Sequence, residues 1–432
     1  MTGQRRPWGR AALWLLLLGP FFFASYGLAT FLASQRADVP AIVFSWESAI
    51  PLLPWTIIPY WSIDLLYGIS LFLCATRAEL DTHAKRLLTA QILAVACFIA
   101  APLRFTFERP VLDGVPGMLF TLLGEFDKPF NQAPSLHIAL LVILWVRFAA
   151  HARGPWLVLL HAWFALIGVS VLTTWQHHFI DIPTGAWLGL LTLWLFPDDA
   201  PSPFAGARLT RDPRRRRLAW RYAAGAVLLV ALALWLQGAA LWLFWPAGSL
   251  FLVALTYAAL GASAFQKDAR GRLRPAVRWL FGPYLIGAAI NTRFWKGDGR
   301  LTAPVTADVA LGRYPSAATA ADFGTVIDLS AELPGRLGSR SYVSIPMLDL
   351  ATPDPALLRQ AAAAIEQGRV AGNVLVNCAL GYSRSAAGAA TWLLATGRAR
   401  DAADAAAQIR AVRPHIVLDA PALAAIAEAA RQ

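Results

Sequence analysis

The sequence predicts a multi-span α-helical membrane domain followed by a small α/β domain. Of its 432 residues, 57% are hydrophobic and only 15% are charged, a balance that is unusual for a soluble chain. Long apolar runs continue to about Phe265, whereas the sequence beyond Gly299 is Ala-rich and mixed in character. We therefore expect a membrane part of about eight helices and a soluble part of roughly 130 residues, which is enough for a compact core.

The candidate spans follow from the rule that crossing a bilayer takes roughly 20 apolar residues. The run that starts at Ala11 has no clear cleavage site, so we expect an uncleaved anchor and not a signal peptide. Residues 41–54 and 281–295 are shorter or interrupted by Pro and Gly, which indicates interfacial or re-entrant pieces. The expected spans are residues 11–33, 55–75, 87–103, 134–150, 155–174, 181–197, 219–244 and 247–265.

These patterns divide the chain into four parts. Residues 1–50 are expected to be an N-terminal anchor and loop, and residues 51–200 a membrane core. Residues 201–298 would add further helices and an interfacial linker, and residues 299–432 would form the soluble domain. The three cysteines, Cys74, Cys97 and Cys378, provide no disulfide framework.

The net charge of +12 comes largely from arginines beside the apolar runs. It therefore indicates membrane topology and contact with anionic lipids, and no nucleic-acid partner is expected. The positive-inside rule places the basic loops in the cytoplasm. We expect a bacterial-type inner membrane protein whose N-terminus and C-terminal domain are cytoplasmic. The residues that carry this interpretation are Arg5, Arg6, Arg10, Arg77, Lys85, Arg86, Arg147, Arg153, Arg208, Arg211, Arg214 to Arg217, Lys267, Arg270, Arg272 and Arg274.

Three polar clusters, at residues 102–110, 131–137 and 173–181, stand at the outer ends of the expected spans. Ionisable groups at membrane depth are costly and usually functional. His177 and Asp181 are four residues apart, so they share a face if the start of the sixth span is helical. A carboxylate there can hold the imidazole in one tautomer and leave the other nitrogen free to attack phosphorus. A second histidine can protonate the leaving oxygen, and arginines can neutralise the phosphate.

These clusters resemble the motifs of the type 2 phosphatidic acid phosphatase (PAP2) family over roughly residues 50–200. The matching positions are Arg109-Pro110, then Pro134, Ser135 and His137, then Ser170, His177 and Asp181. The resemblance implies a PAP2-like helical core. In it, His177 would form a phosphohistidine, Asp181 would orient it, His137 would be the general acid, and Ser135 and Arg109 would bind phosphate.

The match has departures that leave one alternative open. Pro102 and Val171 stand where the family has a lysine and an arginine, and Arg104 is our candidate for one missing cation. The runs 134–137 and 177–181 are most similar to the inositol phosphorylceramide synthase branch. Transfer of the phosphate-bearing group to an alcohol is therefore an alternative to hydrolysis.

Another motif starts at Val374, where a short apolar run leads into Cys378 and, after five residues, Arg384 and Ser385. This pattern is typical of a strand, a tight loop with Gly381, and a helix. Such a loop points backbone N–H groups at an anion, and the helix N-terminus adds positive potential. That environment favours the nucleophilic thiolate, while the guanidinium can grip two phosphate oxygens. The alternative interpretation is a buried structural cysteine.

The surrounding sequence predicts a small, mostly parallel sheet interleaved with helices. Cys378 would open the loop after the last strand, where ligands collect in such folds. The expected strands are 309–311, 326–329, 342–347 and 373–377, and the expected helices are 355–368, 384–396, 401–412 and 420–430.

This half resembles the dual-specificity branch of the cysteine-based protein tyrosine phosphatases. The similarity lies in residues 311–313, 326–329, 345–349 and 378–385. It implies Cys378 as the nucleophile, Arg384 as the phosphate ligand, Ser385 as the group that assists the leaving thiolate, and Asp349 as the general acid. Asp354 is the second candidate for the acid, although a helix N-cap before Pro355 explains it better.

One position departs from that family. Asn377 stands before the cysteine where the family usually has histidine, so activation of the thiolate would be weaker. A phosphate-binding relic without turnover is therefore the alternative for this half.

Together the two halves predict a bifunctional inner-membrane phosphatase that acts on phosphorylated lipids or their head groups. The partners would be membrane lipids and a phosphorylated lipid or phosphoprotein substrate. Neither chemistry needs a cofactor, and we find no metal-ligand spacing in the sequence. A lipid phosphotransferase and a non-catalytic phosphate sensor are the alternatives, and the sequence predicts no oligomeric state.

Overall fold

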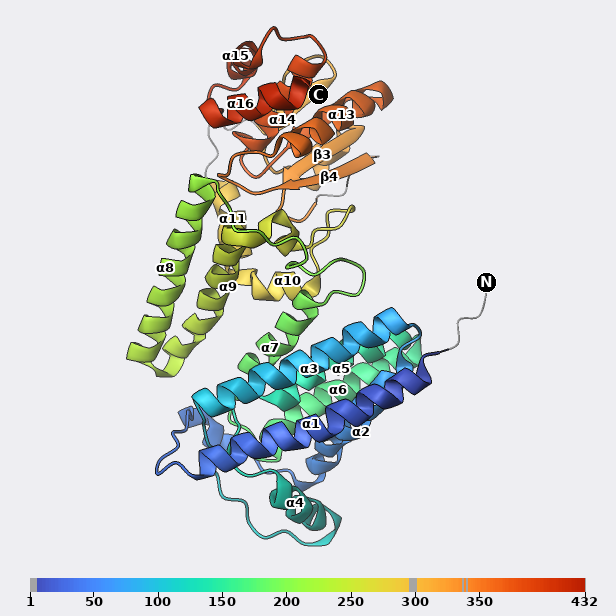
Figure 1. The fold of residues 1–432 in the computed structure, drawn as a ribbon, viewed down its shortest axis with the longest axis vertical. Coiled ribbons are helices and arrows are strands. Elements are labelled where there is room, and N and C mark those ends of the chain that lie inside the picture. The colour runs from blue at the N-terminus through green and yellow to red at the C-terminus, as the bar shows by residue number, and fades with distance from the viewer. Residues whose placement is uncertain (1–5, 295–300, 336–337, 339–340, 432) are drawn as a thin grey trace. The chain divides into compact units, whose positions relative to one another are not determined.

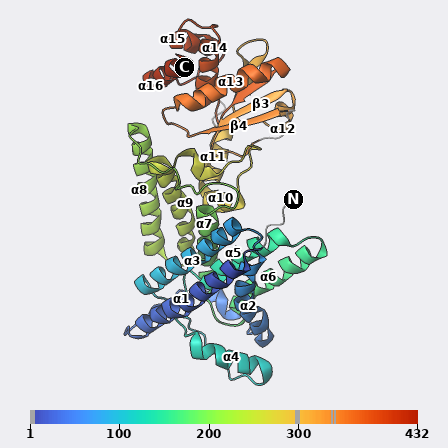
Figure 2. The same ribbon diagram turned by 45° about the vertical axis from the view of Figure 1, so that its right-hand side comes forward.

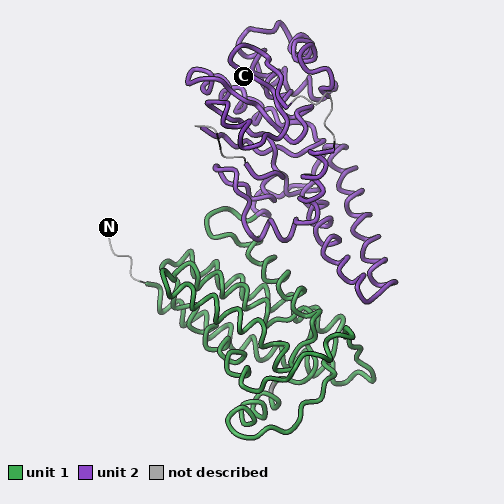
Figure 3. The backbone as a smooth tube through the Cα atoms, turned by 180° about the vertical axis from the view of Figure 1, so that it is seen from behind, with its two compact units in different colours: residues 1–202 green, residues 203–432 purple. Residues whose placement is uncertain are grey.

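The computed structural model describes residues 6–294, 301–335, 338 and 341–431. The chain forms two compact units, Met1–Ser202 and Pro203–Gln432 (Figure 3). The expected boundary between residues 298 and 299 lies outside the described residues, as do Arg5 of the topology argument and position 295 of the expected interfacial piece.

The first unit is built from helices (Figures 1 and 2). Its α5 packs against α2, α3, α6 and α7, and residues on all sides of α5 are buried, as expected for a helix that is apolar all round. The helices are α1 (Trp8–Ser34), α2 (Ile57–Leu73), α3 (Arg77–Ala100), α4 (Gly114–Phe126), α5 (Leu136–His151), α6 (Pro155–Thr173) and α7 (Asp181–Leu195), with short turns η1 (Ser45–Ala49) and η2 (Pro54–Thr56).

Six helices of the described chain are long and apolar enough to cross a membrane. The expected count of about eight is not reached because α5 and α7 have only 16 and 15 residues. At 1.5 Å per residue, such helices extend about 24 Å, less than the roughly 30 Å of hydrocarbon. The six are Trp8–Ser34, Pro54–Leu73, Arg77–Ala100, Pro155–Thr173, Pro213–Leu236 and Gly238–Phe265.

Two glycines bring α7 close to α5. A Cβ atom at Gly185 would lie 2.4 Å from the backbone oxygen of Ser135, and one at Gly189 would lie 2.8 Å from the oxygen of Ala139. Only glycine permits this approach, as in the small-xxx-small contacts of membrane helices. The contact sets the first residue of α7, Asp181, beside the N-cap of α5, where Ser135 N donates to Asp181 O at 3.2 Å.

Two of the arginines expected at the cytoplasmic face are buried and paired. Arg147 contacts Glu79 and donates to Asp198 at 2.9 Å, and Arg86 lies 3.1 Å from Asp198. Arg86 also donates to the Phe196 carbonyl. These two arginines are therefore paired with carboxylates within the first unit.

The second unit begins with a helical hairpin in which α8 and α9 lie side by side (Figures 1 and 2). The hairpin is followed by short helices that lead into the α/β domain. The elements are α8 (Pro213–Leu236), η3 (Gly238–Leu243), α9 (Phe244–Leu255), the π-helical turn η4 (Thr256–Leu260), η5 (Gly261–Phe265), α10 (Pro275–Leu280) and α11 (Gly282–Phe294).

The α/β domain contains a five-stranded sheet with the order β1-β2-β5-β3-β4. The edge strand β1 is antiparallel to β2, and the other pairs are parallel. The strands are β1 (Thr302–Pro304), β2 (Val309–Gly312), β3 (Thr325–Ser330), β4 (Ser341–Met347) and β5 (Val374–Asn377). The helices are α12 (Ala317–Ala321), α13 (Pro355–Ala371), α14 (Arg384–Ala395), α15 (Ala402–Val412) and α16 (Ala420–Arg431).

Side chains alternate between the two faces of this sheet, as the pleat requires. Val374 and Val376 of β5 join the large core formed with α13 to α16, together with Cys378. Leu375 joins a smaller cluster that includes Ala320 of α12. The alternation therefore directs the Cys378 side chain toward the large core and α14.

The α/β class expected from the sequence is confirmed, and each expected strand and helix of this domain is present. The sequence analysis missed β1 and α12. Both are very short, with 3 and 5 residues, so neither leaves a periodic pattern that could be recognised.

A buried ion pair fastens the sheet to the segment that follows the hairpin. Lys267 Nζ lies 2.8 Å from Asp328 Oδ2 and donates to the Ser330 carbonyl at 2.7 Å. Tyr342 also donates to Asp328 Oδ2, at 2.8 Å. Because both charged side chains are almost fully buried, removing either one would leave the other as an uncompensated buried charge.

Candidate active site

Cys378 follows the last residue of β5, and its thiol faces the start of α14. Its Sγ lies 3.2 Å from Ser385 Oγ and accepts from the backbone N–H of Gly381 at 3.3 Å. Hydroxyl and N–H donors at this distance stabilise negative charge on sulfur, and the helix N-terminus adds to that effect. The arrangement suits a thiolate at the carboxyl end of a parallel sheet.

Gly381 gives the loop its shape. Its φ is +77°, which favours glycine, and a Cβ atom there would lie 2.8 Å from the Gly312 backbone and from a guanidinium nitrogen of Arg413. Arg413 donates to the Leu380 carbonyl at 3.2 Å. The loop at Gly381 is therefore packed between the Gly312 backbone and the Arg413 side chain.

Arg384 is the first residue of α14, and its guanidinium is buried against Glu332. NH1 and NH2 each donate to one carboxylate oxygen of Glu332 at 2.8 Å, and NH1 also donates to the Met347 carbonyl at 3.1 Å. This two-point pairing fixes the plane of the guanidinium. Although burial raises the pKa of Glu332, the charge and hydrogen bonds of Arg384 outweigh burial and lower that pKa.

Asp349 lies just after β4 and reaches the same arginine, with Oδ1 3.1 Å from Arg384 NH2. Burial raises the pKa of Asp349 and nearby Glu332 raises it further, while Arg384 lowers it; the net direction is upward from 3.8. A carboxyl group with a raised pKa beside a phosphate-gripping arginine is suited to donate a proton.

The sequence also singled out Asp354 and Asn377. Asp354 accepts from Ala356 N at 2.8 Å and so caps α13, the interpretation that the sequence favoured. Asn377 is buried, and neither side-chain polar atom has a hydrogen-bond partner among the described residues. It therefore gives the cysteine loop no side-chain hydrogen bond.

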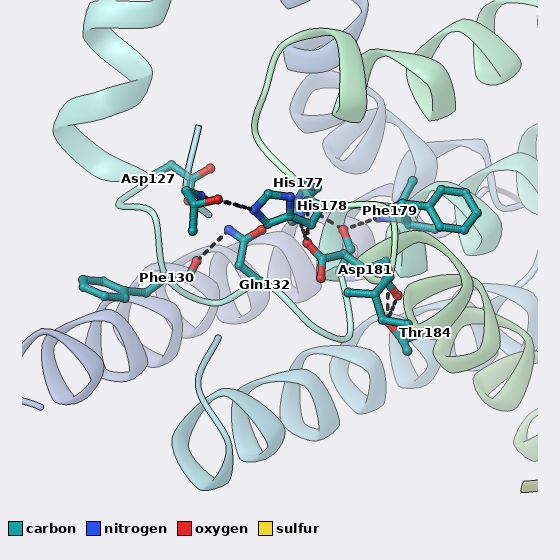
Figure 4. A network of polar contacts seen from close by, with 12 residues as sticks. Asp127, Phe130, Gln132, His177, His178, Phe179, Asp181 and Thr184 are labelled. Carbon is teal, nitrogen blue, oxygen red and sulfur yellow. Dashed lines mark hydrogen bonds and ion pairs between the residues drawn. The ribbon is translucent and has the colours of Figure 1, made fainter. Parts of the chain in front are cut away.

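The histidine cluster of the first unit comes together around His177. Its Nδ1 lies 3.1 Å from Asp181 Oδ2, and its Nε2 lies 3.2 Å from Ser135 Oγ. Figure 4 shows Asp181 and the imidazole turned toward each other, with Gln132 beside them. The contact does not depend on the helical start that the sequence predicted, because α7 begins only at Asp181 and His177 precedes it in the irregular segment 176–178.

His137 and His177 line one cavity of about 440 Å³ together with mostly apolar side chains. The His137 ring stacks on Tyr60, with centroids 4.2 Å apart, and His137 Nε2 has no hydrogen-bond partner in the described chain. Asp127 lines the same cavity and accepts from Tyr26 at 2.6 Å. An apolar cavity with a few polar groups is a typical small-molecule site.

The two arginines expected to bind phosphate line a different cavity. Arg104 and Arg109 border a hollow of about 920 Å³, which also includes Lys128, Gln176 and Asp127. The Arg109 guanidinium lies over the Phe120 ring at 4.9 Å. The structure therefore unites His177, Asp181, Ser135 and His137, but it does not bring Arg104 or Arg109 into contact with them. Asp127 borders both cavities.

His178, which the sequence left ambiguous, has a structural environment. Its Nδ1 lies 2.9 Å from Glu47 Oε2, and its Nε2 accepts from Thr106 N at 3.2 Å. Glu47 also accepts from Phe179 N at 3.0 Å. These contacts hold the turn that presents His177.

Sequence reasoning missed Glu332, Glu47 and Asp127. Glu332 follows a parallel strand, and that position was a usable signal because carboxyl ends of strands form sites. Glu47 and Asp127 lie in irregular segments far from the histidines in sequence, so nothing local indicated them. Among the described residues, no group of three or more His, Cys, Asp or Glu side chains could hold a metal ion.

Comparison with known proteins bears on the α/β domain. Residues 309–432 match the family described as dual specificity phosphatase, catalytic domain. Among solved structures, the chain is similar to Tk-PTP in the active form (24% identity, 31% of this chain and 97% of that chain, TM-score 0.27). It is also similar to PTPMT1 (21% identity, 30% of this chain and 94% of that chain, TM-score 0.27). A third similar structure is human DUSP28 (21% identity, 31% of this chain and 94% of that chain, TM-score 0.26). No curated protein matches the chain.

The family match supports a phosphatase function for the α/β domain and implies a phosphorylated substrate. It does not extend to residues 50–200, so the resemblance of that part to the PAP2 family stays a prediction.

The pairing of Arg384 with Glu332 leads to a prediction about stability. Glu332→Gln should lower the free energy of unfolding of this domain by about 3 kcal/mol, because it removes the charged two-point partner of a buried guanidinium. Pulse proteolysis of the full chain across a urea series measures this change. Since the pKa of Glu332 is lowered by folding, the difference from wild type should be present at neutral pH and shrink as pH falls below about 4.5.

Glu366→Gln is the matched control for that prediction. Glu366 pairs with Arg369 on the surface and accepts from Trp392 Nε1 at 2.8 Å, a bond that the glutamine oxygen can keep, so the substitution should leave the urea midpoint nearly unchanged. Equal shifts for the two variants would contradict the importance of the buried pair.

Proposed function

We propose that this protein is a membrane phosphatase whose α/β domain cleaves phosphate monoesters through Cys378. The observation that carries the proposal is the placement of Cys378, Ser385 and Arg384 around one loop, inside the segment that matches the phosphatase family. The substrates would be phosphorylated lipids or their head groups, because the described part of the chain has six helices long and apolar enough to cross a membrane.

The residues of this site suffice for a two-step reaction. The Cys378 thiolate attacks phosphorus and forms an S–P bond while the P–O bond to the alcohol breaks, and Asp349 gives its proton to the departing oxygen. Arg384 holds the phosphoryl oxygens. Water then attacks the phosphocysteine, Asp349 takes a proton from it, and the thiolate leaves with a hydrogen bond from Ser385. The products are the alcohol and inorganic phosphate.

The second part of the proposal is a histidine site facing the outer side of the membrane. His177 Nδ1, bonded to Asp181, leaves Nε2 as the nucleophile, and Nε2 already lies toward Ser135 Oγ. His177 would take the phosphoryl group, His137 would protonate the leaving oxygen, and water would release phosphate. The largely apolar cavity beside these groups suits a lipid substrate. In this proposal the N-terminus and the α/β domain are cytoplasmic.

A staged loss of activity tests the two-site proposal. With EDTA present and a panel of phospholipid and lysolipid phosphates in mixed micelles, His177→Ala and Cys378→Ser should each remove part of the phosphate release. Each loss should be at least about 10³-fold on the substrates of its own site. The double variant should have no activity above background. Full activity in the double variant would refute both sites.

The same assay separates the alternatives. A new phosphorylated lipid, formed when a lipid alcohol is added, would indicate transfer at the histidine site. Binding of vanadate without product from the cysteine site would indicate a phosphate sensor, an outcome consistent with the unpartnered side chain of Asn377.

The raised pKa of Asp349 predicts the pH dependence of the cysteine site. The acid must hold its proton in the first step, so kcat/KM for a poor leaving group should fall as pH rises through the pKa of Asp349, above 3.8. Asp349→Asn should remove that descending limb and slow the reaction about 10²-fold. The measurement is kcat/KM between about pH 4 and 8 in a His177→Ala background. A limb that persists in Asp349→Asn would assign the proton to another group.

A further inference from the structure

The loop that carries Asp349 has a conformation that its own sequence does not favour. This acid loop, residues 348–354, connects β4 to α13. Leu350, the residue after Asp349, has a φ of +55°, which is strained for any residue with a branched side chain. Its side chain is 63% exposed, so packing of that side chain does not maintain the strain. Contacts to the backbone must do so.

Two hydrogen bonds to the loop backbone come from the helical hairpin of the same unit. Tyr257 Oη donates to the Asp349 carbonyl at 3.0 Å. Asp212 Oδ2 accepts from the backbone N–H of Thr352 at 3.2 Å. The two bonds bracket Leu350, because one holds the peptide group before it and the other holds an amide two residues after it.

Tyr257, which donates the first bond, is itself held in place. Tyr257 belongs to the π-helical turn η4, a distortion that is frequent at functional sites. Arg215 donates to the carbonyls of Tyr257 and Thr256 at 3.1 and 3.4 Å. The Tyr257 ring is 2% exposed and stacks on Tyr222 with centroids 5.6 Å apart. The hydroxyl is therefore aimed before any substrate arrives.

Asp212 is equally constrained. It is the N-cap of α8, where its Oδ1 accepts from Arg214 N at 2.9 Å. Oδ1 thus caps α8, and Oδ2 accepts the hydrogen bond from the acid loop. The N-cap of α8 and the turn η4 that follows α9 both contact the loop, so the open end of the hairpin is the support (Figure 1).

We propose that Tyr257 and Asp212 are positioning residues that hold Asp349 where it can protonate the leaving group. Neither residue touches the substrate; both act through the backbone of the acid loop. Two helices suited to a membrane thereby set the proton-donating power of the cysteine site. This inference rests on the proposed function, because it takes Asp349 as the general acid.

The leaving group gives a readout that a merely structural role would not produce. An alkyl phosphate expels a poor leaving group and needs the acid, whereas p-nitrophenyl phosphate expels a stable phenolate and needs it little. A misplaced acid should therefore lower kcat for the first substrate and leave the second nearly unchanged. A general loss of structure would lower both.

The experiment compares the two substrates in the full chain carrying His177→Ala, so that only the cysteine site acts. Tyr257→Phe removes the hydroxyl and keeps the ring. It should lower kcat for lysophosphatidic acid about tenfold, change KM less than about twofold, and change kcat for p-nitrophenyl phosphate less than about twofold. Asp212→Asn keeps one oxygen for the helix cap and loses the second acceptor, so it should show the same pattern.

Two further variants complete the test. Tyr222→Phe removes a hydroxyl from the ring that stacks on Tyr257 and should leave both rates unchanged. In an Asp349→Asn background, Tyr257→Phe should cause no further loss, because an absent acid cannot be mispositioned.

The outcomes separate this inference from the proposed function. If Cys378→Ser leaves alkyl phosphate turnover intact, the proposed function fails; if Asp349→Asn does so, Asp349 is not the general acid and this inference fails with that assignment. If both abolish turnover or slow it strongly, but Tyr257→Phe and Asp212→Asn lower the rates of both substrates equally or lower neither, only the positioning role is overturned. Should Tyr257→Phe not fold, Asp212→Asn decides the question alone.

Discussion

The buried pair of Arg384 and Glu332 is the contact on which the cysteine site depends. Arg384 begins α14, so its guanidinium would lose its two-point carboxylate partner in the domain core if Glu332 were absent. Glu332 follows β3, so the pair ties the end of one parallel strand to the start of the helix that follows another. The guanidinium is thereby held flat beneath the loop, close to Asp349 as well. Binding geometry and domain stability thus come from one interaction, because an unpaired buried cation is unfavourable for both.

The histidine site depends instead on the close packing of helices α5 and α7. Gly185 and Gly189 let α7 lie against the N-cap of α5, which brings Asp181 to Ser135 and so to His177. The neighbouring turn is fixed by the contact of His178 with Glu47. The first unit therefore relies on close helix packing to bring Asp181 to His177, whereas the α/β domain holds its arginine by charge.

Prediction from sequence succeeded where a signal was local. The run into Cys378 carried its own strand, loop and helix pattern, and the residues around it lie as that pattern indicated. Prediction failed where the partner of a residue lies far away in sequence and where an element is short. Nothing near Arg384 pointed to Glu332, 52 residues away, and the 3-residue strand β1 lies below the length at which periodicity can be read. The lengths of α5 and α7 were overestimated, because the apolar residues continue beyond the caps and turns at which these helices end.

The contact between Lys267 and Asp328 has a consequence for the order of assembly. Lys267 lies before the sheet in sequence, so the ribosome makes the hairpin and this lysine ahead of every strand. When β3 is synthesised, the lysine that pairs with its buried carboxylate is therefore already part of the chain. The strand can be buried with its counter-charge available.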